Sequence, residues 1–491
     1  MSRHRISRSV RLPLQSRRTI SSSPSTISEG RPPTAPKQTP NLAHIRQNAD
    51  LYAENARLRN YTSHIEAPAQ IVAATQKIAD IEAKLKQPRT QVKALQARMQ
   101  SKSADRNKIL EEIRKLKPAI DHLEKEQDAL QSQVQEMALG LPNLTSSDTP
   151  LEGEGRLLRY INYDEAKPPT FEKGADHSRI GEELSLIDFA GAGATSGWGF
   201  YYLMNEGAML EQALVQYALR VARRHGWGIV SPPSLVYAHV AESCGFQPRD
   251  QHGEQQIWQV AQSEREAGKP KRSLAATAEI PLAGLYAGKD INEGQLPVKM
   301  VGSSRCYRAE AGARGVDTKG LYRVHEFTKV EMFAWTNNSG AGVEGSMQES
   351  TKDASVVFDE MVTIQTEILT SLGLPCRVLE MPVSDLGASA YRKIDIEALF
   401  PSRLSRDGGW GEVTSTSICT DYQSRRLNTR ILDKGGSRKK FAYTLNGTAI
   451  AVPRVLAAVL EHGWREQEKC VMIPEVLRSY MGGIDRITPV R

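Results

Sequence analysis

The residue types that bind nucleotides are concentrated between Cys306 and Trp335. Two strands joined by a glycine-rich turn would bring alternate side chains to one face of a sheet. The first strand would present Arg308 and Glu310, and the second Arg323, His325, Phe327, Lys329 and Glu331. Guanidinium groups bind phosphate, an aromatic ring stacks on a base, and a carboxylate accepts hydrogen bonds from an amine. The pattern indicates a nucleotide site; the alternative is a surface hairpin with cross-strand ion pairs.

The elements that must position these residues belong to a chain of mixed type after residue 146. Apolar residues at helical spacing and a glycine stop predict a helix over Glu206–Gly226. β-rich runs predict strands over Lys299–Cys306 and Val330–Trp335. Because the two types alternate irregularly, we expect an α+β fold with an antiparallel sheet.

Residues 68–137 show two heptad runs, in which apolar residues alternate at steps of three and four. The first run comprises Ile71, Ala74, Ile78, Ile81, Leu85, Pro88, Val92, Leu95 and Met99. The second comprises Ile109, Ile113, Leu116, Ile120, Leu123, Gln127, Leu130, Val134 and Met137. A short polar segment separates them, so the pattern predicts an antiparallel helical hairpin. Pro88 and Pro118 lie at similar distances from its tip near Ser103 and predict matched kinks.

The far end of this hairpin is strongly basic. Eleven cationic residues and only three acidic ones lie from Lys84 to Lys117. A long lever with positive charge at its tip suits a phosphate backbone, whereas the alternative is an ordinary solvated helix face. The residues we expect to contact nucleic acid are Lys93, Arg98, Lys102, Arg106 and Lys108.

Residues 1–40 have the composition of a mitochondrial transit peptide, being rich in arginine and serine with Glu29 as the first acid. The predicted location is the mitochondrial matrix. The alternatives are a disordered basic tail that touches RNA and a cytoplasmic protein.

Several function classes are excluded by what the sequence lacks. It has no apolar run long enough to cross a membrane. Its five cysteines form no C-x-x-C pair, which argues against a disulfide framework or a cysteine zinc site. H-E-x-x-H and G-x-S-x-G motifs are also missing, which removes the commonest metalloprotease and α/β-hydrolase interpretations. The net charge of +7 weakly favours an acidic partner.

Taken together, the motifs resemble those of seryl-tRNA synthetases, which are class II aminoacyl-tRNA synthetases. The segment from Cys306 to Trp335 resembles motif 2, the segment from Asn446 to Glu461 motif 3, and the segment from Gly226 to Pro233 motif 1. Thr277-Ala278-Glu279 resembles the serine loop, and Glu412 to Arg426 a further family segment. The resemblance implies three parts: a leader (1–40), a two-helix coiled-coil tRNA-binding arm (41–145) and a class II catalytic domain with helices flanking its antiparallel sheet (146–491).

The resemblance also implies a role for each matching residue. Catalytic contacts with ATP and the serine carboxylate fall to Arg308, Glu310, Arg323 and Arg454. The serine pocket comprises Thr277, Ala278, Glu279, Arg308, Glu331 and Thr448. The ATP site comprises Arg308, Ala309, Glu310, Val324, Phe327, Glu412, Val413, Thr414, Ser415 and Arg454. Mg²⁺ would bind Glu412 and Ser415, since this ion prefers hard oxygen ligands.

The implied reaction joins L-serine to ATP as seryl-adenylate and then transfers serine to the 3′ end of tRNA(Ser) for mitochondrial translation. No protein nucleophile is needed, so positioning and charge neutralisation carry the catalysis. The implied partners are serine, tRNA(Ser) and a second copy of the chain in a homodimer, with no membrane. The alternatives are a non-catalytic RNA-binding relative and a carrier-protein ligase, and the long hairpin argues against the latter.

Three positions depart from the family pattern. Glu326 stands where glutamine usually precedes the phenylalanine of motif 2, and Gly199 where arginine usually precedes Phe200. Pro88 lies within the arm. The first two put local stability or phosphate contacts in doubt, and the third affects the docking angle of the arm.

Overall fold

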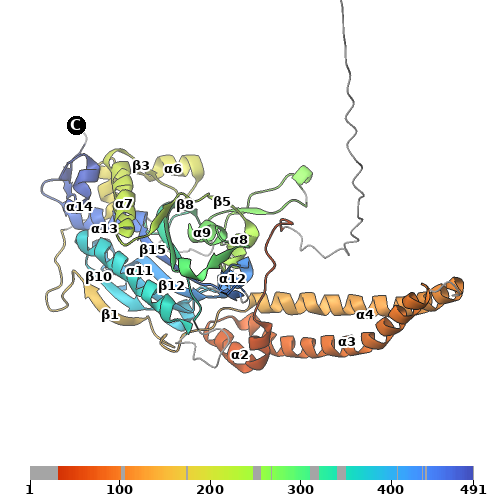
Figure 1. Cartoon of the computed structure of the whole chain (residues 1–491). Helices are drawn as coiled ribbons and strands as arrows, with labels where there is room; N and C mark the ends of the chain where they lie inside the picture. Colours follow the sequence, from red (N-terminus) through yellow and green to blue (C-terminus); the bar gives the residue numbers. More distant parts are fainter. Residues whose placement is uncertain are drawn as a thin grey trace, which may run out of the picture.

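The computed structural model describes residues 31–489 apart from 101–104, 173–174, 247–255, 267, 310–319, 340–349, 406, 434 and 437–438. Three expectations therefore lie outside the described residues: the leader up to residue 30, Lys102 at the arm tip and Glu310 in the nucleotide site. In the part that is described, a long arm projects from a body built around a large sheet (Figure 1). None of the described helices is both long and apolar enough to cross a membrane.

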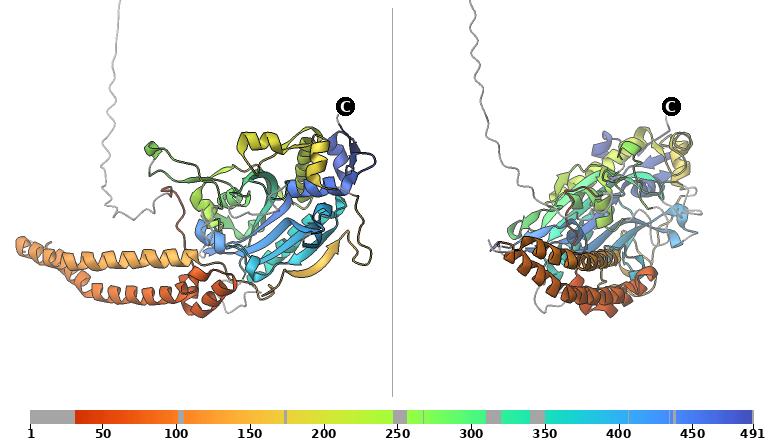
Figure 2. Two further views of the ribbon diagram at one scale, coloured as in Figure 1. Left: turned by 180° about the vertical axis from the view of Figure 1, so that it is seen from behind. Right: turned by 90° about the vertical axis from the view of Figure 1, so that its right-hand side faces the viewer.

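The arm is the helical hairpin that the heptads predict. Its two long helices are α3 (Ala67–Arg98) and α4 (Arg106–Gly140), which run side by side away from the body (Figure 1, Figure 2). Asp105 caps α4 because its carboxylate accepts a hydrogen bond from the Lys108 N–H at 3.2 Å. The buried residues of the seam include Ile71, Ile81, Leu85, Leu95, Ile109 and Val134.

Both prolines lie inside continuous helices, Pro88 in α3 and Pro118 in α4. The distal part of α3 runs at an angle to its proximal part (Figure 2), which agrees with the loss of one helical hydrogen bond at a proline. The polar seam residue Gln127 is explained by its partner, since its amide donates to Glu82 Oε2 at 2.9 Å. Arg89 in turn bridges Glu82 and Glu124 at 3.1 and 3.0 Å. Polar contacts thus join the two helices near Pro88.

The base of the arm is anchored to the body by buried hydrogen bonds. Two short helices, α1 (Leu42–Gln47) and α2 (Ala49–Leu58), precede the hairpin. The buried Arg59 guanidinium donates to the carbonyls of Leu386 and Ala390 at 3.2 and 3.0 Å. The Asn143 amide donates to the Ser389 carbonyl at 2.8 Å. A buried arginine whose terminal nitrogens bind several carbonyl groups holds one orientation, so the arm leaves the body in a defined direction.

Residues 31–40, which the sequence assigned to the leader, lie against the folded body. The Thr39 N–H donates to the Arg425 carbonyl at 2.9 Å. The Gln135 side chain donates to the Gln38 carbonyl at 3.0 Å, and Arg31 folds back on Gln38 at 2.7 Å. This segment connects α12 (Tyr422–Leu427) with α4, so any leader that is removed without loss of these contacts ends before Arg31.

The body is the predicted α+β domain. Among the described residues its main sheet has eight strands in the order β1-β10-β11-β12-β15-β9-β8-β4. These are β1 (Arg156–Ile161), β10 (Cys376–Glu380), β11 (Arg392–Leu399), β12 (Trp410–Thr420), β15 (Tyr443–Ala451), β9 (Glu326–Thr336), β8 (Val298–Tyr307) and β4 (Gly228–Val230). Neighbouring strands are antiparallel except β4, which pairs parallel with β8.

The two faces of this sheet have different roles, as the alternation of side chains along β9 shows. Val330, Met332 and Ala334 point into the main core, which they share with α7 (Asn205–Arg224), α11 (Lys352–Ser371) and α13 (Val452–Gly463). Phe333 and Trp335 join a second core with α8 (Ala238–Ser243) and α9 (Glu279–Gly284). Phe327, Lys329 and Glu331 alternate in phase with Phe333 and Trp335, so they lie on the same face of β9. That face carries the site described below.

The other described elements are short and connect or flank these layers. The helices are α5 (His177–Glu183), α6 (Phe189–Ser196) and α14 (Glu475–Arg478). The strands are β2 (Ile187–Asp188), β3 (Tyr202–Leu203), β5 (Leu235–Tyr237), β6 (Arg272–Leu274), β7 (Asp290–Asn292), β13 (Arg430–Leu432), β14 (Lys439–Phe441), β16 (Trp464–Arg465), β17 (Cys470–Met472) and β18 (Arg486–Ile487).

Two expectations about the hairpin of β8 and β9 are wrong in detail. β8 ends at Tyr307, so Arg308 lies just beyond the strand, and β9 begins at Glu326, so Arg323 and His325 precede it. Beyond the strand ends only one bond of the ladder forms: the Arg308 N–H donates to the His325 carbonyl at 2.8 Å, whereas the His325 N–H donates to the Gly199 carbonyl at 2.8 Å. The imidazole Nδ1 of His325 instead lies 3.0 Å from the Arg308 carbonyl.

Candidate active site

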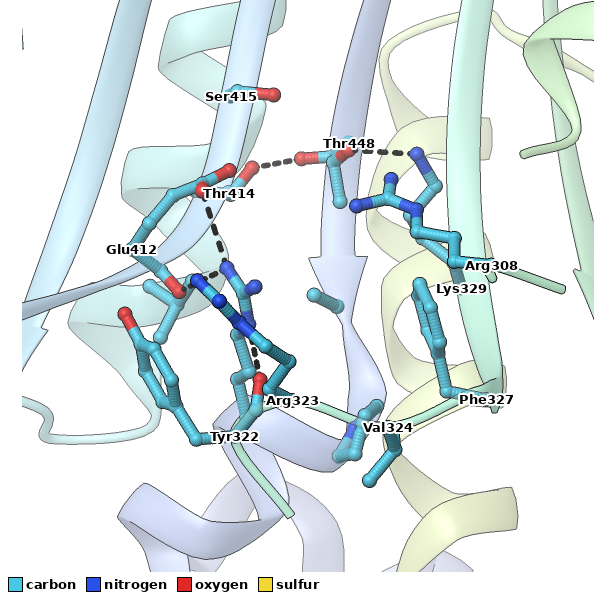
Figure 3. Close-up of a pocket in the computed structure, with 14 residues that line it drawn as sticks. Arg308, Tyr322, Arg323, Val324, Phe327, Lys329, Glu412, Thr414, Ser415 and Thr448 are labelled. Carbon is cyan, nitrogen blue, oxygen red and sulfur yellow. Dashed lines mark hydrogen bonds and ion pairs between the residues drawn. The ribbon is translucent and has the colours of Figure 1, made fainter. Parts of the chain in front are cut away.

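A pocket opens where β9, β12 and β15 meet the start of α13 (Figure 3). Four segments far apart in the sequence therefore contribute to one cavity. The lining residues are Arg308, Tyr322, Arg323, Val324, Phe327, Lys329, Glu412, Val413, Thr414, Ser415, Thr448, Ala451, Pro453 and Arg454. Ten of the site positions that the resemblance implies are among them, so the tertiary fold brings together most of those residues.

Arg308 lies across this pocket with its guanidinium over the Phe327 ring, 5.3 Å from the ring centre. Its Nε is buried and has no hydrogen-bond partner among the described residues. A buried guanidinium nitrogen without a partner is costly. The geometry therefore leaves this arginine available for an anionic group that enters the pocket beside Phe327.

Arg454 forms the opposite wall. Its Nη1 lies 3.1 Å from Glu412 Oε2, and its Nε donates to the Tyr322 carbonyl at 3.0 Å. Burial alone would raise the pKa of Glu412, but Arg454, Lys393 and Arg308 together outweigh it and lower that pKa to about 2. Glu412 is therefore a carboxylate at all physiological pH values.

Glu412 and Ser415 are three residues apart, which on a regular strand would put them on opposite faces. The pairing of β12 with β11 shifts by one residue between them, because Asp395 pairs with Ser415 whereas Glu397 pairs with Glu412. A β-bulge of this kind changes the phase of the strand. It brings the Glu412 carboxylate and the Ser415 hydroxyl to the same face of the sheet.

A buried hydrogen-bonded triad lies at the other end of the pocket. Lys329 Nζ lies 2.6 Å from Glu331 Oε2 and donates to Thr448 Oγ1 at 3.2 Å. The Thr448 hydroxyl in turn donates to Glu331 Oε2 at 3.0 Å. All three side chains are less than a tenth exposed. This end of the pocket can exchange hydrogen bonds with a small polar ligand.

Glu279 extends this polar surface from the start of α9. Its carboxylate accepts hydrogen bonds from Gln423 at 2.6 Å and Asn446 at 2.9 Å. Thr277 Oγ1 accepts from the Glu279 N–H at 3.3 Å, and Ala278 is fully buried beside it. Burial first and the Glu331 carboxylate second raise the pKa of Glu279 to about 8.

Replacing Glu279 with glutamine should change how stability depends on pH. In the wild type the folded state keeps a proton up to about pH 8 that the unfolded chain releases near 4.5. Wild-type stability should therefore decrease from pH 5 to pH 8 relative to the Glu279→Gln variant, in which this proton is permanently replaced by an amide. Thermal melting at pH 5, 6.5 and 8 measures the difference. A difference in Tm that stays constant with pH would contradict the raised pKa.

The resemblance gave no role to four residues that the structure places in or beside the site. Lys329 belongs to the triad. The Tyr322 ring lies under the Arg454 guanidinium, whose Cζ is 4.6 Å from the ring centre. Gln423 and Asn446 donate hydrogen bonds to the Glu279 carboxylate. Alternation along the strand already put Lys329 on the same face as Phe327 and Glu331. The partners of Glu279 become visible only in three dimensions. Ala309 is held apart from the cavity by its N–H, which donates to the Gln256 carbonyl at 3.1 Å.

Both departures in the sequence near the site have a local explanation. Gly199 has φ +82°, and a Cβ there would lie 2.4 Å from His325 Cδ2, so arginine is incompatible with this histidine position. Glu326 forms an ion pair with Arg305 at 2.9 Å, outside the pocket. Neither departure removes a side chain that lines the cavity.

Two family domains match the chain. Residues 264–463 match the tRNA synthetase class II core domain (G, H, P, S and T). Residues 41–145 match the seryl-tRNA synthetase N-terminal domain. The core match covers every residue that lines the pocket, which makes the site that of a class II aminoacyl-tRNA synthetase.

Relatives narrow this class. The chain is 37% identical over 442 residues to the mitochondrial serine–tRNA ligase of Saccharomyces cerevisiae, covering 89% of this chain and 91% of that protein. It is 36% identical over 438 residues to the serine–tRNA ligase of Rhodopirellula baltica, with 89% and 97% covered. The structure of seryl-tRNA synthetase from Pyrococcus horikoshii complexed with ATP superimposes with a TM-score of 0.79 at 28% identity, over 92% and 100% of the two chains. This chain belongs to the seryl-tRNA synthetase family, and its activity is that of a serine–tRNA ligase.

Proposed function

We propose that ATP binds between Arg308 and Arg454 and that L-serine binds against Glu331 and Thr448. The observation that carries this assignment is the continuity of the pocket, whose guanidinium end and triad end share Arg308, Phe327 and Lys329 along one wall. The adenine ring stacks on Phe327, and Arg308, Arg323 and Arg454 neutralise the phosphates. Glu310 holds the adenine amine, as the family resemblance implies.

Chemistry then follows from position. The serine carboxylate attacks the α-phosphorus and expels pyrophosphate, and Arg308 between the two sites contacts both reacting groups. The serine ammonium faces Thr277 and the carboxylates of Glu279 and Glu331. A cation beside Glu279 favours the ionised form of its carboxyl group. The ammonium group of bound serine would supply this positive charge.

Selectivity arises at the triad. The serine hydroxyl exchanges hydrogen bonds with Glu331 and Thr448, and alanine would leave these buried groups without that partner. Threonine carries an additional methyl group, which the packed strand surface excludes sterically.

Mg²⁺ fits the oxygen ligands of Glu412 and Ser415. Among the described residues no group of three His, Cys, Asp or Glu side chains could hold a metal alone. A two-residue site of hard oxygens completed by substrate phosphates is typical of Mg²⁺. The ion supplies charge neutralisation at the phosphates when bound, and Arg454 holds Glu412 in place from the protein side.

The second substrate is tRNA(Ser), whose backbone suits the basic arm. Lys93, Arg98, Arg106 and Lys108 are all exposed near the tip. Because a coiled coil presents charge without a pocket for bases, it recognises the shape of a long RNA helix better than its sequence. Serine transferred to the 3′ end of this RNA is the product.

The assembly we propose is a homodimer formed through the sheet edge at β4. Ile229 is 47% exposed there, and Leu235 and Tyr237 of β5, the next strand along the chain, are 44% and 39% exposed. An apolar edge of this kind is covered in a stable protein. Sedimentation equilibrium should show two chains per particle, and a monomer at micromolar concentration would refute this arrangement.

The location we propose is the mitochondrial matrix. The arginine-rich residues 1–30 and the mitochondrial relative in yeast support it. Residues 1–40 fused to a fluorescent reporter should direct it to mitochondria, and a diffuse cytosolic signal would favour the cytoplasmic alternative.

Serine-dependent ATP–pyrophosphate exchange tests the adenylation site directly. We expect exchange with serine and none above background with alanine or threonine, followed by charging of tRNA(Ser) when the RNA is added. A folded dimer that lacks exchange but binds tRNA would instead support a non-catalytic RNA-binding protein.

A further inference from the structure

A buried histidine–carboxylate pair lies behind the pocket and is not part of the site described above. His177, the first residue of α5, is 7% exposed, and its Nδ1 lies 2.6 Å from Glu461 Oε1 on α13. The Ser402 hydroxyl also donates to Glu461 Oε1, at 2.7 Å, and the Ser402 N–H donates to Oε2 at 3.0 Å. Three segments of the chain therefore meet at one carboxylate.

The other ring nitrogen of His177 contacts the segment that enters the pocket. The Leu321 N–H donates to His177 Nε2 at 3.0 Å. Because a backbone N–H can only donate, Nε2 must be the acceptor and Nδ1 must carry the proton that Glu461 accepts. The carboxylate thus selects the one tautomer that can hold Leu321.

The fit at this contact is close. Gly320 has φ +79°, and a Cβ at that position would lie 2.2 Å from His177 Nε2. Leu321 is fully buried. The backbone therefore approaches the imidazole at a point where any side chain on residue 320 would displace it.

Helix α13, which carries Glu461, also holds Tyr322, the residue after Leu321. Arg454 and Glu461 are seven residues apart on α13, which places them two turns apart on one face. Arg454 donates to the Tyr322 carbonyl at 3.0 Å, and Glu461 acts through His177 on the Leu321 N–H. Two adjacent backbone groups are fixed by one helix, immediately before Arg323 and Val324 enter the pocket.

We propose that His177 is a positioning residue for the ATP phosphates, which holds Leu321 so that Arg323 and Arg454 face one another across the bound nucleotide. This inference rests on the proposed roles of those two arginines. His177 touches no substrate, and its effect passes through the backbone of residues 321–323.

Two substitutions test the roles of the two ring nitrogens of His177 separately. The terminal oxygen of glutamine can replace Nε2 as the acceptor for Leu321, whereas the asparagine amide can replace Nδ1 as the donor to Glu461 but is too short to reach Leu321. We expect His177→Asn to raise the KM for ATP in serine-dependent exchange by about 10-fold, with a smaller change in the KM for serine. His177→Gln should stay within about 3-fold of wild type for both substrates, although both variants lower the Tm.

A matched control is His225, which forms another histidine–carboxylate pair with Glu367 at 2.7 Å and does not line the pocket. His225→Asn should leave both KM values unchanged. Calorimetric titration of each variant with ATP gives a readout that does not require turnover. The proposal would be overturned if His177→Asn bound ATP as tightly as the wild type. It would also be overturned if the asparagine and glutamine variants lost ATP affinity equally and in proportion to their loss of Tm. Failure of the proposed function is distinct, because then the wild type itself would show no exchange.

Discussion

Replacing Arg308 with alanine should reduce serine-dependent ATP–pyrophosphate exchange by about 1,000-fold, the order of magnitude expected when a group that stabilises transition-state charge is removed. The physical reason is its position over Phe327 with a buried Nε that lacks a partner among the described residues. Because this nitrogen has no protein partner to lose, the Tm should change little. The exchange rate and the melting temperature of the same preparation measure both effects.

Arg305 offers the matched control, since it lies three residues before Arg308, near the end of β8, and pairs with Glu326 at 2.9 Å outside the pocket. Arg305→Ala removes the same charge from β8 and should keep exchange within about 3-fold of wild type. Retention of more than a tenth of the wild-type rate in Arg308→Ala would contradict the role of Arg308. An equal loss in Arg305→Ala would show that positive charge in this region, and not the position of Arg308, causes the effect.

Replacing Thr448 with valine should lower kcat/KM for serine by about 100-fold while leaving the KM for ATP nearly unchanged. Valine has the shape of threonine but removes the hydroxyl that donates to Glu331 and accepts from Lys329. A serine hydroxyl then meets a site with one hydrogen-bonding group fewer, and discrimination against alanine shrinks accordingly. Exchange measured over a range of serine concentrations, with alanine in parallel, gives the ratio.

The control for this change lies on the same strand. Thr444 is buried, and its hydroxyl donates to the Thr420 carbonyl at 3.4 Å, away from the pocket. Thr444→Val should affect stability without changing the preference for serine. An unchanged serine-to-alanine ratio in Thr448→Val would place hydroxyl recognition elsewhere in the site.

The arm shows how much a strong local pattern decides. Heptads predicted two helices, their antiparallel pairing and the buried faces, because the helical repeat alone determines which side chains share a face. The seam has two residues that break the heptad pattern, Gln127 and Pro88. Gln127 is accommodated by Glu82 of the facing helix. Pro88 lies inside α3, whose distal part runs at an angle to its proximal part (Figure 2).

Residue identities alone indicated a nucleotide site, and the reaction followed from the resemblance of the ordered motifs to those of seryl-tRNA synthetases. The tertiary structure decided which of these residues meet. Arg308 lies beyond β8, where His325 gives its carbonyl to the Arg308 N–H but its own N–H to Gly199, and the bulge in β12 aligns Glu412 with Ser415. His177 carried no sequence pattern, and its role depends on a contact 144 residues along the chain. Local periodicity depends only on residues that are close in the sequence. The phase of a strand and the partner of a buried group depend on which distant residues the fold places beside them.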